Sequence, residues 1–215
     1  MGKITGLERP EDVPPKVLKM YRAVLELIEE GADTAGFRVS TVTDRAGIGK
    51  GTAYEYFETK EEIVACAVVN YLQQLFGSLR QILSGIGTFE GQLDFLLNEM
   101  EKQDGKKFCF LRFVHILTDN SEFSKSVQQK IESEEFTYYR PLVVFSELIQ
   151  QAVDRGELRE DLPVEYMVYS VFSHLVTYIM ALTSEENHKL SAEKLRPFVK
   201  QGILDELCKK NVQKE

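Results

Sequence analysis

Cysteine is scarce in this chain of 215 residues, and tryptophan and long apolar runs are absent. The three cysteines, Cys66, Cys109 and Cys208, contain no C-x-x-C pair, which argues against a disulfide framework and a structural zinc site. The most apolar segment, 168–182, is shorter than the roughly 20 residues that a membrane span needs. The first residues lack the apolar core of a signal peptide. We therefore expect a protein of the reducing cytoplasm that does not enter a membrane.

An excess of positive charge is also missing. The net charge is −8, with 26 Lys and Arg against 34 Asp and Glu, so the chain is not a general coat for nucleic acid. The acidity is uneven, because residues 1–60 carry 9 basic and 10 acidic residues, while the remainder carries 17 and 24. This distribution is compatible with a nearly neutral DNA-binding segment followed by an acidic body.

Strand signals are nearly absent, since the chain has no sustained period-2 alternation and no Asn-Gly or Asp-Gly turn. Apolar residues recur instead every three or four positions, which predicts an all-α fold. The first expected helix begins after Pro14 and Pro15 and stops at Gly31. Pro141 should kink or divide a long helical region, and Asp161 should cap the next helix. The other expected helices cover about 39–46, 50–57, 60–83, 89–102, 107–117, 122–154, 162–182 and 192–210.

The most informative stretch is 39–60, with the sequence VSTVTDRAGIGKGTAYEYFETK. It predicts two short helices joined by a turn at Gly47. Ala53 and Phe57 are four residues apart, so they share the buried side of the second helix. The open amides at the start of that helix, together with Lys50 and nearby hydroxyl groups, suit a phosphate. A helix-turn-helix is the simplest structure that uses these features together.

Residues 46–61, AGIGKGTAYEYFETKE, resemble the signature of the tetracycline-repressor (TetR) family, A-G-V-S-x-G-T-x-Y-x-Y-F-x-x-K-E. The resemblance covers about residues 15–65. It implies a three-helix DNA-binding domain at 1–60 and a helical effector-binding and dimerisation domain at 61–215. It also implies that seven residues face DNA: Ser40, Lys50, Gly51, Thr52, Tyr54, Tyr56 and Lys60. Gly49 replaces the usual Ser and Arg38 the usual Thr, which weakens the caps of both short helices.

This stretch has three alternative interpretations: a nucleotide-binding loop, packing tyrosines and a simple helix cap. A nucleotide-binding loop is disfavoured, because no apolar strand precedes the glycines and Gly51 stands where that motif needs Ser or Thr. Tyr54 and Tyr56 would be packing aromatics on an arbitrary helix. Ser40, near the start of a helix, has a simple capping role as its alternative.

The body suggests an interface and a pocket. Segment 162–182 is apolar or small nearly all round and is predicted to pair, with segment 142–153, across a two-fold axis in a four-helix dimer interface. The alternative is a monomeric core. Aromatic residues with polar neighbours predict a site for an apolar or aromatic ligand, although a core uses the same residues. The candidates are Phe110, Phe113, His115, Tyr139, Phe145, His174 and Tyr178.

These features predict a dimeric regulator that binds a palindromic double-stranded operator and represses until a small ligand releases it. One alternative is a regulator whose body only dimerises, and the other is an all-helical enzyme. No catalytic motif supports an enzyme, and we expect no cofactor. A metal site is disfavoured, because Cys109 and His115 are six apart and lie on different faces of a helix.

Overall fold

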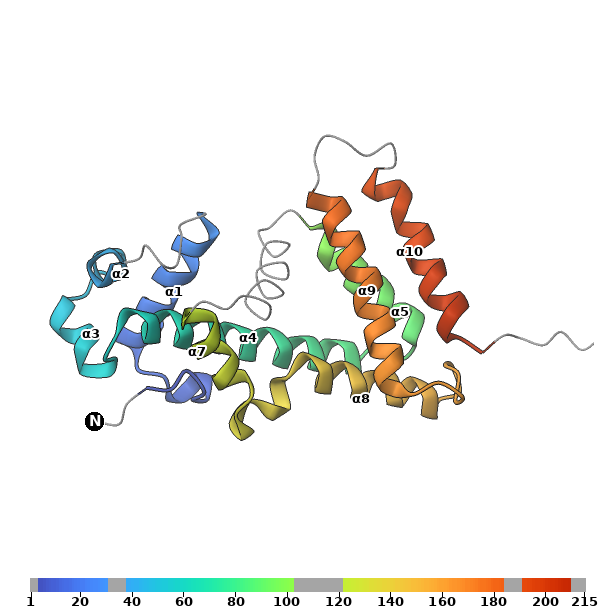
Figure 1. The fold of residues 1–215 in the computed structure, drawn as a ribbon, viewed down its shortest axis with the longest axis horizontal. Helices are drawn as coiled ribbons and strands as arrows, with labels where there is room; N and C mark the ends of the chain where they lie inside the picture. Colours follow the sequence, from blue (N-terminus) through green and yellow to red (C-terminus); the bar gives the residue numbers. More distant parts are fainter. Residues whose placement is uncertain (1–3, 31–37, 103–121, 184–190, 210–215) are drawn as a thin grey trace, which may run out of the picture. The chain divides into compact units, whose positions relative to one another are not determined.

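The computed structural model describes residues 4–30, 38–102, 122–183 and 191–209 (Figure 1). Within these ranges the protein is helical, and the only β-type pairing is an isolated bridge between Leu158 and Cys208. The predicted all-α fold is confirmed. The chain divides into two compact units, which are described separately below. None of the described helices is long and apolar enough to cross a membrane.

The first unit comprises the described parts of Met1–Gly77 and Arg112–Arg140. Its helices are η1 (Pro10–Asp12), α1 (Pro15–Glu29), α2 (Val39–Ala46), α3 (Lys50–Tyr56), the beginning of α4 (Lys60–Ser84), α7 (Glu122–Ile131) and η3 (Glu134–Tyr139). Helix α1 buries Val17, Met20, Tyr21, Val24 and Leu27, a spacing of three and four residues that forms one helical face. That face packs with residues of α2, α3 and α4 in a single hydrophobic core.

The helix-turn-helix follows from local chemistry. Gly47 ends α2 in the left-handed conformation, with φ +65°, which a side chain would strain. The amide of Ile48 then donates to the carbonyl of Thr43 at 3.0 Å, so the chain turns directly into α3. Val42, Ala53 and Phe57 are almost fully buried and hold the two helices on the core. The glycine turn and the bounds of α2 are as predicted from the sequence, and α3 ends one residue before the predicted end at 57.

The second unit comprises the described parts of Ser78–Leu111 and Pro141–Glu215. It contains the end of α4, α5 (Phe89–Glu101), α8 (Pro141–Asp154), α9 (Val164–Thr183) and α10 (Ala192–Leu207). Helix α9 packs against both α8 and α10. Ion pairs also tie α10 to α5, since Arg196 contacts Glu101 at 2.7 Å and Lys200 contacts Asp94 at 2.8 Å.

Two of the helix boundaries predicted for the body can be compared with the described residues, and one predicted helix cannot. Pro141 does divide the long helical region, because it is the first residue of α8. Asp161 does not cap α9: that helix begins at Val164, and the Asp161 carboxylate accepts hydrogen bonds from Arg159. The predicted helix at 107–117 lies outside the described residues.

Candidate nucleic-acid interface

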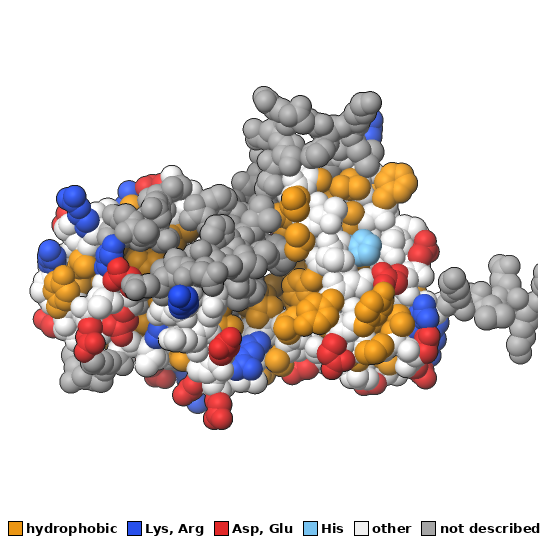
Figure 2. All heavy atoms as spheres, in the orientation of Figure 1, with side chains coloured by type: hydrophobic (Ala, Val, Ile, Leu, Met, Phe, Trp, Pro, Cys, Tyr) orange, Lys and Arg blue, Asp and Glu red, His pale blue; other side chains and the backbone are white. Residues whose placement is uncertain are grey.

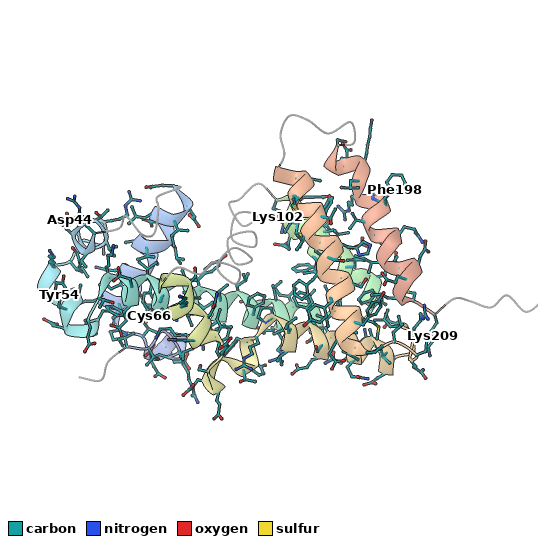
Figure 3. The ribbon with its side chains drawn as sticks, viewed as in Figure 1. Asp44, Tyr54, Cys66, Lys102, Phe198 and Lys209 are labelled. Carbon is teal, nitrogen blue, oxygen red and sulfur yellow. The ribbon has the colours of Figure 1, made fainter. Side chains whose placement is uncertain are left out.

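The exposed side of the helix-turn-helix is formed by residues that point away from the core. Lys50, Gly51 and Tyr54 on α3 are exposed, and the Tyr54 side chain is 52% accessible. Figure 3 shows Tyr54 at the outer edge of this unit. Thr52 is half-buried on α3, Ser40 on α2 and Lys60 at the start of α4. Six of the seven predicted DNA-facing residues are therefore at least partly accessible.

Tyr56 is the exception, because its side chain is largely buried, and its predicted contact with DNA stays a prediction. It is only 6% accessible and belongs to the hydrophobic core, with its ring centroid 6.5 Å from that of Phe57. The reason is helical geometry: Tyr56 lies three residues after buried Ala53 and shares its side of α3. Tyr54, two residues away, points in nearly the opposite direction. Of the two tyrosines, only Tyr54 presents its ring to solvent, so the packing alternative applies to Tyr56.

The two short helices lack side-chain caps, as expected from Arg38 and Gly49, which replace the usual Thr and Ser of the family. Arg38 precedes α2 and Gly49 precedes α3, both in extended conformation, and neither makes a side-chain capping hydrogen bond. The first amides of α3 thus lack a side-chain cap. An ideal Cβ built on Gly49 or Gly51 meets nothing within 4 Å, so packing inside the protein does not require glycine at either position.

Charges on this surface are mixed rather than uniformly basic. Figure 2 shows lysine and arginine side chains interspersed with acidic and hydrophobic ones over α2 and α3. Arg45 is held against α1 by Glu30, at 2.5 Å, and this hydrogen bond lowers the pKa of Glu30 and raises that of Arg45. Lys60 lies 3.4 Å from Glu61. Lys50 has no ion-pair partner among the described residues, which leaves its ammonium group available to a phosphate.

Glu55 also lies on this surface, although it was not among the DNA-facing residues predicted from the sequence. It is exposed on α3, beside Tyr54 and four residues after Gly51. Its position on the helix could have identified it, because Glu55 follows Ala53 by two residues and therefore points to nearly the opposite side of α3.

The candidate ligand residues do not converge on one ligand-sized space in the described structure. Phe110, Phe113 and His115 lie outside the described residues. Tyr139 lies in the first unit and packs against α4, where a Cβ on Gly77 would be 3.2 Å from its ring. Phe145, His174 and Tyr178 lie in the second unit.

These second-unit residues have packing roles. Tyr178 is fully buried, donates a hydrogen bond to Glu101, and has a raised pKa chiefly because of burial. Phe145 stacks edge-on against Phe172 with centroids 4.8 Å apart. It also lines an apolar cavity of about 20 Å³, which has room for roughly one water molecule. His174 is half-buried, with Nδ1 2.9 Å from the carbonyl of Ser170. Phe145 and Tyr178 are therefore buried in the core, the alternative to a ligand-binding role that the sequence left open.

No group of three or more His, Cys, Asp or Glu side chains suitable for a metal ion occurs in the described ranges. Cys66 is buried, which raises the pKa of its thiol to about 12, so this cysteine is chemically inert at neutral pH.

Comparison with known proteins extends the similarity over most of the chain. No family model matches it. The helix-turn-helix-type transcriptional regulator YvdT of Bacillus subtilis, whose own role is uncharacterised, is 23% identical over 202 residues, covering 90% of this chain and 98% of YvdT. The helix-turn-helix-type transcriptional repressor KstR2 of Rhodococcus jostii is 30% identical over 139 residues, covering 60% of this chain and 63% of KstR2.

Solved structures show the same fold. A protein from Rhodococcus sp. assigned to the TetR-family transcriptional regulators superposes with a TM-score of 0.64 at 16% identity, covering 89% of this chain and 98% of that one. The transcriptional regulator FadR of Bacillus subtilis, solved in complex with stearoyl-CoA, also has a TM-score of 0.64, at 17% identity, covering 87% of this chain and 97% of FadR.

Proposed function

We propose that this chain, a helix-turn-helix transcriptional regulator with the TetR-type fold, binds a palindromic operator as a homodimer and represses until a small ligand releases it. The observation that carries the proposal is the outer side of α3, where Lys50, Gly51 and Tyr54 are exposed directly after the Gly47 turn. A helix of this width enters the major groove, and an ammonium group and a phenolic hydroxyl are suitable donors to phosphate oxygens. Ser40, Thr52 and Lys60 supply further donors at its edges.

The proposed homodimer is supported by exposed apolar side chains of the second unit. Phe198 on α10 is 68% accessible, and Tyr169 and Met180 on α9 are 61% and 57% accessible. Figure 2 shows hydrophobic side chains at the surface of these two helices. Soluble monomers seldom expose large apolar patches. A second copy is the expected occupant, because two recognition helices must lie about 34 Å apart to contact both halves of a palindrome.

The sequence suggested that α8 and α9 pair across the two-fold axis, and that pairing stays a prediction. Helix α8 buries Val144, Phe145, Leu148, Ile149 and Ala152 within its own unit and exposes one large hydrophobic residue, Leu142. Helix α10 likewise exposes one, Phe198, which is the more accessible of the two. We therefore add Phe198 of α10 to the proposed interface beside α9.

The proposed effector is an apolar or aromatic small molecule. FadR of Bacillus subtilis with its bound stearoyl-CoA supports a ligand with a long apolar part. Release requires that the ligand favour a conformation in which the two recognition helices no longer match the operator spacing. Helix α4 is the proposed link, since it begins at Lys60 in the first unit and ends in the second.

The test is operator binding at two salt concentrations. The chain is titrated by fluorescence anisotropy against a palindromic fragment from upstream of its own gene. Phosphate contacts predict that affinity falls steeply with salt, and that Lys50→Ala lowers the salt slope by about one. Lys19→Ala, an exposed lysine on α1, is the matched control and should leave the slope unchanged. Absent binding to DNA, or binding insensitive to salt, contradicts the proposal.

The effector arm uses the same assay. Stearoyl-CoA added to the complex should lower the anisotropy, whereas coenzyme A alone should not. If neither this thioester nor free fatty acids or steroids release the operator, the effector-independent regulator becomes the better interpretation.

A further inference from the structure

Helix α3 presents few side chains with which to recognise a base. Its exposed residues are Lys50, Gly51, Tyr54 and Glu55. Because Gly51 has no side chain, the chemical groups on this surface are one ammonium, one phenol and one carboxylate. Residues four apart lie on the same side of a helix, so Glu55 and Gly51 share the side opposite buried Ala53.

The Glu55 carboxylate is unusual on a surface that meets DNA. It has no hydrogen-bond or ion-pair partner in the described part of the chain. An ionised carboxylate accepts hydrogen bonds and donates none. Phosphate oxygens also only accept and are negatively charged, so a contact between them and Glu55 is repulsive. The hydrogen-bond donors that the major groove offers to Glu55 are the exocyclic amines of cytosine and adenine.

Cytosine is the better partner of the two. Its N4 amine is its only polar group in the major groove, whereas the N6 amine of adenine lies beside the N7 acceptor, which repels a carboxylate. The absent side chain at Gly51, where an added Cβ meets nothing within 4 Å, leaves bare backbone next to Glu55. The helix can therefore approach the base edges closely on this side.

We propose that Glu55 determines operator specificity by accepting a hydrogen bond from the N4 amine of a cytosine in each half-site. This inference rests on the proposed function. At guanine or thymine the carboxylate faces no donor, and at adenine the neighbouring N7 repels it. Glu55 thus strengthens binding to the operator and weakens binding to other DNA, which suits a chain whose first 60 residues carry no positive excess.

The experiment is selection of binding sites from random double-stranded DNA with the full-length protein, for wild type, Glu55→Ala and Glu55→Gln. Wild type should enrich a palindrome with a cytosine at one position of each half-site, preferred over other bases by about 5- to 100-fold. Glu55→Ala should lose the preference at that position alone. Glu55→Gln should change it to adenine, since a glutamine amide pairs with both N6 and N7.

Glu11→Gln is the matched control. Glu11 is exposed on η1, in the same unit, so its replacement makes the same charge change away from α3. It should retain the wild-type preferences, and thermal unfolding should show that all variants fold. Glu55 variants that keep the wild-type preference at every position overturn the inference while leaving the proposed function intact. A wild-type protein that enriches no sequence overturns the proposed function itself, and the inference with it.

Discussion

Replacement of Gly51 by alanine separates the needs of the fold from those of DNA binding. Gly51 lies in the first turn of α3, is exposed, and has no positive φ. Glycine within a helix costs up to about 1 kcal/mol relative to alanine, and an added Cβ here meets nothing within 4 Å. Gly51→Ala should therefore raise the free energy of unfolding by up to about 1 kcal/mol, or the melting temperature by about 2–4 °C for a chain of this size.

The same methyl group should weaken operator binding. It projects about 1.5 Å from the exposed side of α3, one carbon–carbon bond length. A displacement of this size lengthens a hydrogen bond of about 2.9 Å beyond its useful range. The loss of one charge-assisted hydrogen bond, about 1.5–3 kcal/mol, corresponds to roughly a 10- to 150-fold lower affinity.

Two measurements on each variant check this reasoning: thermal unfolding by circular dichroism, and operator affinity by fluorescence anisotropy. Gly87→Ala is the matched control, because a Cβ there also meets nothing within 4 Å but the residue lies in the second unit. It should leave operator affinity unchanged. A Gly51→Ala protein that is more stable and binds the operator as tightly as wild type would refute the placement of this surface against DNA.

Three further predictions follow from burial and charge. Tyr56→Ala should cost about 3 kcal/mol of stability because the side chain is in the core, whereas Tyr54→Ala should stay within about 0.5 kcal/mol by thermal unfolding; equal losses would contradict the assignment. Phe198→Glu should give a helical monomer by light scattering at micromolar concentration, while a persisting dimer would exclude α10 from the interface. Hydrogen bonds from Ser170 and Tyr166 lower the pKa of Glu206 below 4.5. The contribution of Glu206 to the free energy of unfolding is therefore complete above pH 4.5 and is lost as the pH falls through the lowered pKa. The stability of Glu206→Gln should depend less steeply on pH in acid unfolding, and an unchanged profile would count against this role.

Tertiary packing, and not the local sequence, decides which side chains of the helix-turn-helix are buried. From the sequence, Tyr54 and Tyr56 are two tyrosines on one short helix, and the family signature places both on DNA. They differ in burial because residues of α1 and α4 cover one side of α3, and a difference of two positions along the helix decides which ring is covered. The same argument applies to α8, because the sequence alone does not show that Val144, Phe145, Leu148, Ile149 and Ala152 are buried within the second unit.

The candidate ligand residues could not be separated from core residues by composition alone. Phe145 and Tyr178 have the aromatic and polar character of a binding site, yet both are core residues, and the described cavity beside Phe145 holds about one water. Asp161 was expected to cap α9 and instead pairs with Arg159, because a cap depends on where the chain turns and not on residue type alone.

What the sequence by itself determined is the local structure: an all-helical chain, the bounds of α2 and, within one residue, of α3, the left-handed turn at Gly47, and the division at Pro141. These features depend on backbone conformation and on hydrogen bonds between residues a few positions apart, which a short stretch of sequence specifies. Only the tertiary structure decided that Tyr56 is buried and that Glu55 is exposed and unpaired. Accessibility is a property of what packs against a residue, and those neighbours come from distant parts of the chain.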